Sequence, residues 1–146
     1  MGLPDDVASS YDVVFCSHIL EHIAYPDKLL ADIKNKLISD DSMLLVALPN
    51  FMNYKNRMKM LMGKFEYEKD GTMDYTHLRW YTFKTGKELL EKNNFTILIS
   101  QVEGFLPLNS VLKYLPVVVK DVIVKSLLFF SKGLFGSQLI FIAMKR

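Results

Sequence analysis

The chain has 146 residues, 50% of them hydrophobic and 23% charged, and a formal net charge of +2. This composition predicts one globular domain with a buried core and excludes wholesale disorder. The near balance of charge predicts no nucleic-acid partner, and the single cysteine excludes an internal disulfide and a multi-cysteine zinc site.

The first part of the chain predicts a strand, a helix and a second strand. Residues 1–10 form a polar lead-in without the apolar run of a secretory signal, so the cytoplasm is the expected location. Tyr11–Ser17 is a short apolar run, predicted as a strand buried on both faces. Apolar residues at helical spacing predict a helix over Pro26–Leu37, and Met43–Leu48 is a second apolar strand. Such a βαβ crossover implies a parallel sheet.

The remaining elements complete an α/β domain over residues 11–146. A helix rich in Met and Lys is predicted over Asn53–Gly63. Thr85 and Glu88 match a capping box, which predicts a helix start at Thr85 and a helix that ends near Asn93. Further strands are predicted over 95–102 and 138–144.

The segment Val111–Phe135 is strongly apolar but interrupted by charges, so a transmembrane helix is not expected. On a helical wheel the charged positions gather within about 140°, and the rest of the circle is mostly apolar. The apolar surface of such a helix has to be shielded from water by another part of the protein, a partner or a membrane. A packed cap or subunit interface is one interpretation, and contact with a membrane surface is the other, which makes a membrane-peripheral location an alternative.

The residues His18 to His22 spell H-x-x-E-H, the inverted motif of some zinc proteases. On a helix, two imidazoles four residues apart share a face and could bind zinc while Glu21 activates water. Here the motif directly follows a strand, and Pro26 leaves no room for a long helix. A zinc hydrolase through His18, Glu21 and His22 is therefore a minor alternative, and no metal is expected.

Polar residues follow the two predicted parallel strands. Cys16, Ser17 and His18 stand at the carboxyl end of the first strand, and Asn50 stands at that of the second. Ligands of open parallel sheets bind beyond the carboxyl ends of the strands, so these side chains predict a site at one rim of the sheet.

Three motifs in order resemble class I S-adenosylmethionine-dependent methyltransferases, closest to the group with ubiquinone-type and sugar O-methyltransferases. The first is the strand followed by Leu20-Glu21-His22, the second is the strand that ends in Pro49-Asn50, and the third is the loop Asp74–Thr82. The resemblance covers residues 11 to about 104 and the last strand.

The resemblance implies a truncated Rossmann-like sheet with strands four to seven of seven. The strand over 138–144 is then expected between those over 43–48 and 95–102, antiparallel to both, with the strand over 11–17 at an edge. The family's glycine-rich cofactor loop has no counterpart here, because none of the seven glycines forms G-x-G. The chain is therefore expected to pair its edge strand with a second copy or with a missing N-terminal half.

The resemblance also implies site residues, each with a structural alternative. Cys16, Ser17 and His18 would flank S-adenosylmethionine, or simply end a strand, with Cys16 an inert small hydrophobe. His77 is the best candidate base and His22 a second one, although both could be packing groups.

Three further residues are assigned to the methyl acceptor. Asn50 and Asp74 would bind it, and Arg79 would hold an anionic one. Asn50 could instead cap the helix that follows it, and Arg79 could form a surface salt bridge.

The expected function is methyl transfer to an oxygen of a small-molecule, sugar or lipid-linked acceptor. The alternative is a non-catalytic remnant or interaction module without the cofactor-binding half.

Overall fold

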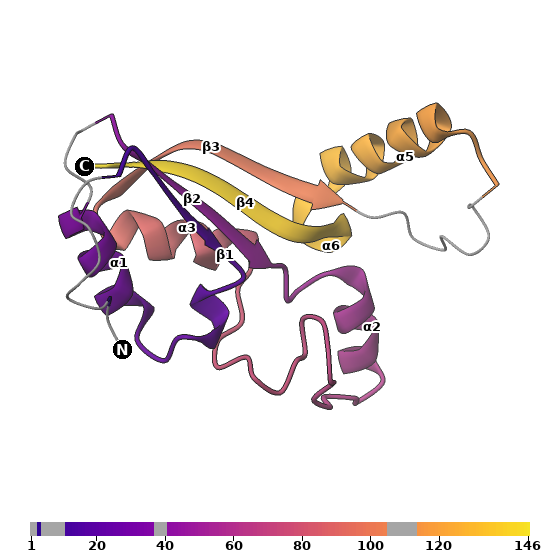
Figure 1. Ribbon diagram of the computed structural model, residues 1–146. Helices are drawn as coiled ribbons and strands as arrows, with labels where there is room; N and C mark the ends of the chain where they lie inside the picture. Colours follow the sequence, from indigo (N-terminus) through magenta and orange to yellow (C-terminus); the bar gives the residue numbers. More distant parts are fainter. Residues whose placement is uncertain (1–2, 4–10, 37–40, 105–113) are drawn as a thin grey trace.

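The computed structural model describes residues 3, 11–36, 41–104 and 114–146. Within them a four-stranded sheet has the order β1-β2-β4-β3 (Figure 1). Strand β1 (Val13–Ser17) pairs in parallel with β2 (Met43–Pro49), and β4 (Gly136–Lys145) lies antiparallel between β2 and β3 (Phe95–Gly104). The predicted strand order, the antiparallel last strand and the edge position of the first strand are confirmed.

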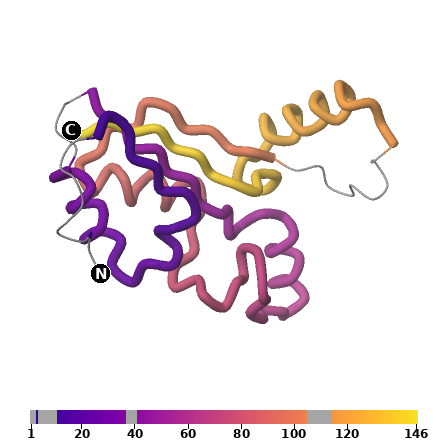
Figure 2. Tube along the Cα trace, viewed as in Figure 1, coloured from indigo at the N-terminus to yellow at the C-terminus, as the bar shows by residue number. Residues whose placement is uncertain are grey.

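Helix α1 (Pro26–Lys36) connects β1 to β2, as the βαβ prediction requires. It lies on the same side of the sheet as α3 (Phe83–Lys92), and the chain can be followed from indigo to yellow in Figure 2. Beyond the carboxyl ends of β1 and β2 lies α2 (Tyr54–Leu61), where the side chain of Asn53 accepts a hydrogen bond from the backbone N–H of Asn56.

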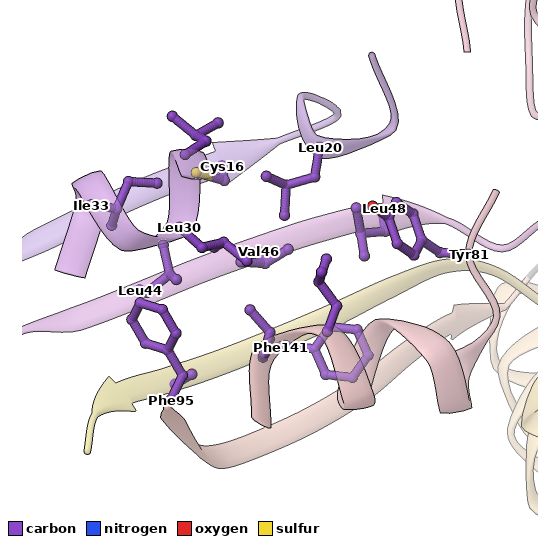
Figure 3. Packing of buried hydrophobic residues seen from close by; sticks show 14 of the residues in the cluster. Cys16, Leu20, Leu30, Ile33, Leu44, Val46, Leu48, Tyr81, Phe95 and Phe141 are labelled. Atoms are coloured by element: carbon purple, nitrogen blue, oxygen red, sulfur yellow. The ribbon is translucent and has the colours of Figure 1, made fainter. Parts of the chain in front are cut away.

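The hydrophobic core lies between the sheet and the helices α1 and α3 (Figure 3). Leu30 of α1, Leu90 of α3 and Phe141 of β4 are fully buried in it. The rings of Phe141 and Phe83 lie 5.7 Å apart. Each such side chain contributes roughly 1.5–3 kcal/mol to folding through burial.

The start of α3 differs from the prediction. The cap is Thr82, three residues before the expected start, and its hydroxyl accepts a hydrogen bond from the N–H of Thr85. The Thr85 hydroxyl in turn accepts one from the N–H of Thr82. A threonine at the third helical position therefore does what Glu88 was expected to do, and the helix begins earlier.

The prediction that the first strand is buried on both faces is wrong. Cys16 is buried toward α1, but Val13 and Phe15 on the other face are 46% and 63% exposed. Side chains alternate along a strand, and in the described part of the chain nothing covers this face at the sheet edge.

The predicted apolar segment contains α5 (Val117–Phe130) and the short α6 (Lys132–Phe135), whereas residues 105–113 lie outside the described part. Helix α5 extends past the end of β3 (Figure 1). Its Val124 and Leu128 side chains pack against Gly104. Its exposed residues include Val117, Val118, Val122, Phe129 and Phe130. No helix in the described ranges is long and apolar enough to span a bilayer.

Candidate functional site

A polar cavity of about 370 Å³ lies at the carboxyl ends of β1 and β2, and of the residues predicted at this rim His18 lines it. The turn after β1, the end of β2, the start of β4 and the loop 71–77 line it. The polar residues that line it are His18, Glu21, His22, Thr72, Asp74, His77, Ser137 and Gln138.

Glu21 is the most deeply buried acid of this cavity. It belongs to a single 3-10 turn, η1 (Leu20–His22), and its side chain is 0% exposed. Neither carboxylate oxygen has a hydrogen-bond partner among the residues that the structure describes. The Glu21 carbonyl accepts hydrogen bonds from the N–H groups of Leu78 and Arg79, which tie the turn to the neighbouring loop.

His22 and His77 lie beside Glu21, with ring centroids 4.6 Å apart. The Nδ1 of His77 is 3.2 Å from the carbonyl oxygen of Thr72, so that nitrogen carries a proton and donates. The Nδ1 of His22 is 3.2 Å from the carbonyl oxygen of Thr76 and donates in the same way. Both Nε2 atoms, when neutral, therefore present a lone pair.

Asp74 holds this arrangement from the loop side. Its Oδ1 accepts hydrogen bonds from the hydroxyl and the backbone N–H of Thr76. These two bonds lower the pKa of Asp74 below the usual value, so the carboxylate is ionised at neutral pH. The Thr76 hydroxyl uses its proton to bind Asp74. Its oxygen, 3.1 Å from His22 Nδ1, can therefore only accept, and it is a second acceptor for that nitrogen beside the Thr76 carbonyl.

The geometry excludes the zinc-hydrolase alternative through His18, Glu21 and His22. That motif needs a helix, but His18 has a φ of +52° in the left-handed region and η1 is a single turn. His18 Nε2 accepts a hydrogen bond from Gln138, and its Nδ1 lies 3.3 Å from Glu21 Oε1, too poorly aligned for a hydrogen bond. The potential ligand atoms that converge come from Glu21, His22 and His77.

The three residues expected at the cofactor differ in their exposure to solvent. Ser17 and His18 are exposed at the end of β1. Cys16 is buried in the core (Figure 3), and burial raises the pKa of its thiol to about 11. Contacts of Cys16, Ser17 and His18 with the cofactor stay predictions. The Cys16 side chain packs in the hydrophobic core.

Asn50 and Arg79 are not brought into the same cavity. The fully buried Asn50 donates from Nδ2 to the carbonyl oxygens of Gly133 and Gly136, 3.0 and 2.8 Å away. Arg79 donates from Nε to the Ala24 carbonyl and lines a separate depression beside Asp27. Their contacts with an acceptor stay predictions, as do those of Asp74, which does line the cavity.

The sequence did not indicate the residues that orient the histidines. Thr72 acts through its backbone carbonyl, which no side-chain pattern reveals. Gln138 comes from β4, 120 residues after His18. Thr76 stands next to His77 in the motif, so the sequence could have indicated it as a residue that orients a histidine.

Comparison with known proteins agrees with this fold. The model of a family described as a methyltransferase domain matches residues 4–100. No protein with a curated description matches the chain. An S-adenosylmethionine-dependent methyltransferase from Archaeoglobus fulgidus is 22% identical, with a TM-score of 0.56, over 94% of this chain.

Two other solved structures have similar folds. A methyltransferase from Methanosarcina mazei is 14% identical over 94% of the chain, with a TM-score of 0.56. Magnesium protoporphyrin IX methyltransferase from Synechocystis, with bound SAH, is 13% identical over 97%, with a TM-score of 0.53. The chain spans 61%, 60% and 48% of the three relatives. Because the family model matches about two thirds of its sequence, the chain belongs to the methyltransferase domain family of S-adenosylmethionine-dependent enzymes.

Proposed function

We propose that the chain contributes the acceptor-side half of an S-adenosylmethionine-dependent methyltransferase that methylates an oxygen of a small-molecule, sugar or lipid-linked acceptor. One observation carries this proposal. In a chain of this family, the imidazoles of His22 and His77 and the buried carboxylate of Glu21 line a cavity at the carboxyl ends of the parallel strands.

The described residues fit one side of the cofactor. Ser17 and His18 are exposed next to the cavity and can offer polar contacts. A close approach of backbone to the cofactor needs a glycine-rich turn, and the sequence contains no G-x-G. The chain therefore supplies a wall of the cofactor site, and the glycine-rich turn has to come from residues other than these 146.

When bound, S-adenosylmethionine supplies an electrophilic methyl group. The part of this chain is to position the acceptor and take its proton. His77 Nε2 can accept the hydroxyl proton because Nδ1 already donates to the Thr72 carbonyl. The resulting positive charge on His77 is stabilised by the nearby carboxylates of Glu21 and Asp74.

Calorimetric titration of the chain with S-adenosylmethionine tests whether it binds the cofactor alone. We expect no heat of binding up to 1 mM, and binding only when a glycine-rich N-terminal half is joined or added. With that half present, His77→Gln should lower the rate of methyl transfer 10²–10⁴-fold, as expected for loss of a general base. Exposed Gln101→Ala on β3 is the control. An unchanged rate in His77→Gln would refute the role of base.

A second candidate is a non-catalytic interaction module. The observation that favours it is the exposed apolar edge strand β1, where Val13 and Phe15 face outward beside an apolar cavity of about 340 Å³. If the chain remains without cofactor binding when an N-terminal half is supplied, but forms a stable complex through β1, this second function replaces the first. Light scattering distinguishes a complex of two copies from a monomer.

A further inference from the structure

We propose that Glu21, His22 and His77 form a binding site for a divalent transition-metal ion of the zinc type. The three potential ligand atoms, one from each residue, lie within 4.8 Å of one another. A zinc ion with bonds of about 2.0–2.1 Å would hold them about 3.3 Å apart. Side-chain rotations that close each gap by at most about 1.5 Å therefore suffice.

The buried carboxylate is the first independent reason for a cation here. Glu21 is 0% exposed, and neither of its oxygens has a hydrogen-bond partner among the described residues. An ionised carboxylate in this position is strongly unfavourable unless a cation compensates for it. His18 Nδ1 lies 3.3 Å from Glu21 Oε1 but forms no hydrogen bond with it.

The second reason is the orientation of both imidazoles. A metal-bound histidine typically donates its other ring N–H to a carbonyl or carboxylate, which fixes the ring and its tautomer. Here His22 and His77 both donate from Nδ1 to backbone carbonyls, those of Thr76 and Thr72. Asp74 extends this support by binding the Thr76 hydroxyl.

The donor set selects the class of metal. Two imidazoles and one carboxylate suit zinc, cobalt, nickel or iron, whereas magnesium and calcium prefer oxygen ligands. Three protein ligands at the wall of a cavity leave a coordination position open, as in catalytic rather than structural zinc sites. Because the three residues line the cavity assigned to the acceptor, an acceptor oxygen could take the open position. This last point rests on the proposed function, whereas the metal site itself does not.

Because Nε2 of His77 has one lone pair, His77 takes the acceptor proton only in the metal-free protein. A metal ion held by Glu21, His22 and His77 would instead lower the pKa of a coordinated acceptor hydroxyl. A chelator should then lower the rate of methyl transfer in the complete enzyme at least tenfold, and zinc should restore it. A rate insensitive to chelator leaves His77 as the base and refutes a catalytic role of the metal.

Metal binding is tested without cofactor or acceptor, so its outcome is independent of methyl transfer. The 146-residue chain, made without a polyhistidine tag and freed of metal, is titrated calorimetrically with Zn²⁺, and Co²⁺ is followed by its visible absorption. We expect one equivalent to bind with a Kd in the micromolar range or below. His22→Ala and His77→Ala should each weaken binding at least tenfold. His22 is exposed, so its replacement leaves the fold intact.

Two controls make the result specific. His18→Ala should change the Kd less than threefold, since His18 is outside the converging group. Glu88→Gln, which alters an exposed acid of α3, should have no effect. Loss of binding in His18→Ala with retention in His77→Ala would show that the sequence motif binds the metal and would overturn the proposal, as would absence of binding by the wild-type chain at 100 µM Zn²⁺.

Glu21→Gln gives a readout that a purely structural glutamate would not give. In chelator, the variant should melt at the same temperature as the wild type or higher, because it buries no unpaired charge. In excess zinc, only the wild type should gain stability, since ligand binding to the native state raises the melting temperature. A lower melting temperature of Glu21→Gln in chelator, with the same gain in zinc as the wild type, would contradict the site.

Discussion

The junction of α6 and β4 offers a sharp test of the packing. An ideal Cβ built on Gly136 would lie 2.0 Å from Val102 Cγ1 and 2.6 Å from the carbonyl oxygen of Lys132. At Gly133, three residues earlier, the nearest atom is the flexible end of Arg57, 3.6 Å away. Replacing Gly136 by Ala should therefore cause steric clashes, whereas replacing Gly133 by Ala should cause none.

Overpacking of a tight site costs about 1–3 kcal/mol, and a clash with backbone cannot be relieved by a rotamer change. We therefore expect Gly136→Ala to lower the free energy of unfolding by about 3 kcal/mol. Gly133→Ala should lie within about 0.5 kcal/mol of the wild type or stabilise slightly, because alanine is the better helix former. With an m-value of about 1.5–2 kcal/mol/M, the Gly136 variant should shift the urea midpoint by about 1.5–2 M.

A double-mutant cycle separates the two contacts. In a Val102→Ala background the side-chain clash is removed but the contact with the Lys132 carbonyl persists, so the cost of Gly136→Ala should fall by about half. Urea unfolding of the four proteins, followed by circular dichroism, measures the coupling. Equal losses at Gly133 and Gly136, or a loss below about 0.5 kcal/mol at Gly136, would refute the packing described for this junction.

Three further predictions concern buried groups. Phe141→Ala should cost about 3–5 kcal/mol in urea unfolding, because a fully buried ring leaves a cavity; a loss under 1 kcal/mol would contradict the core. Asn50→Ala should cost about 2 kcal/mol, since the carbonyls of Gly133 and Gly136 lose their donor, and a neutral result would mean that the amide does not hold α6 to β2. The Cys16 thiol has a pKa of about 11 in the native state against 9.0 unfolded, so above pH 9 the unfolded state binds fewer protons and stability falls as pH rises toward 11. Cys16→Ala should remove that part of the pH dependence, and the native thiol should resist alkylation at pH 9; rapid alkylation of the folded protein would show that it is not buried.

Much of the fold could be predicted because it depends on local patterns. The apolar runs of β2 and β4 and the periodicity of α1 are visible in the sequence, and the motif resemblance implied the strand order. The start of α3 was misplaced because Thr82 and Thr85 compete with Thr85 and Glu88 as a capping pair. The exposure of β1 was misjudged because a short apolar run does not say whether both faces are covered.

The candidate site was predictable only in part. His22, His77 and Asp74 were singled out by residue type and motif, and the structure brings them to one cavity. Arg79 belongs to the same motif but turns to the Ala24 carbonyl on another side of η1. A motif specifies which residues lie near one another along the chain and does not specify the direction of each side chain.

The sequence by itself determined the family, the parallel pairing of the first two strands and the rim at which polar residues gather, because each depends on the order of residue types along the chain. Only the tertiary structure decided that Glu21 is buried beside two oriented imidazoles, with no hydrogen-bond partner among the described residues, rather than being one member of an H-x-x-E-H helix. The reason is physical. The left-handed turn at His18 and the backbone carbonyls of Thr72 and Thr76 set the direction of these side chains, and neither leaves a mark in the pattern of side chains.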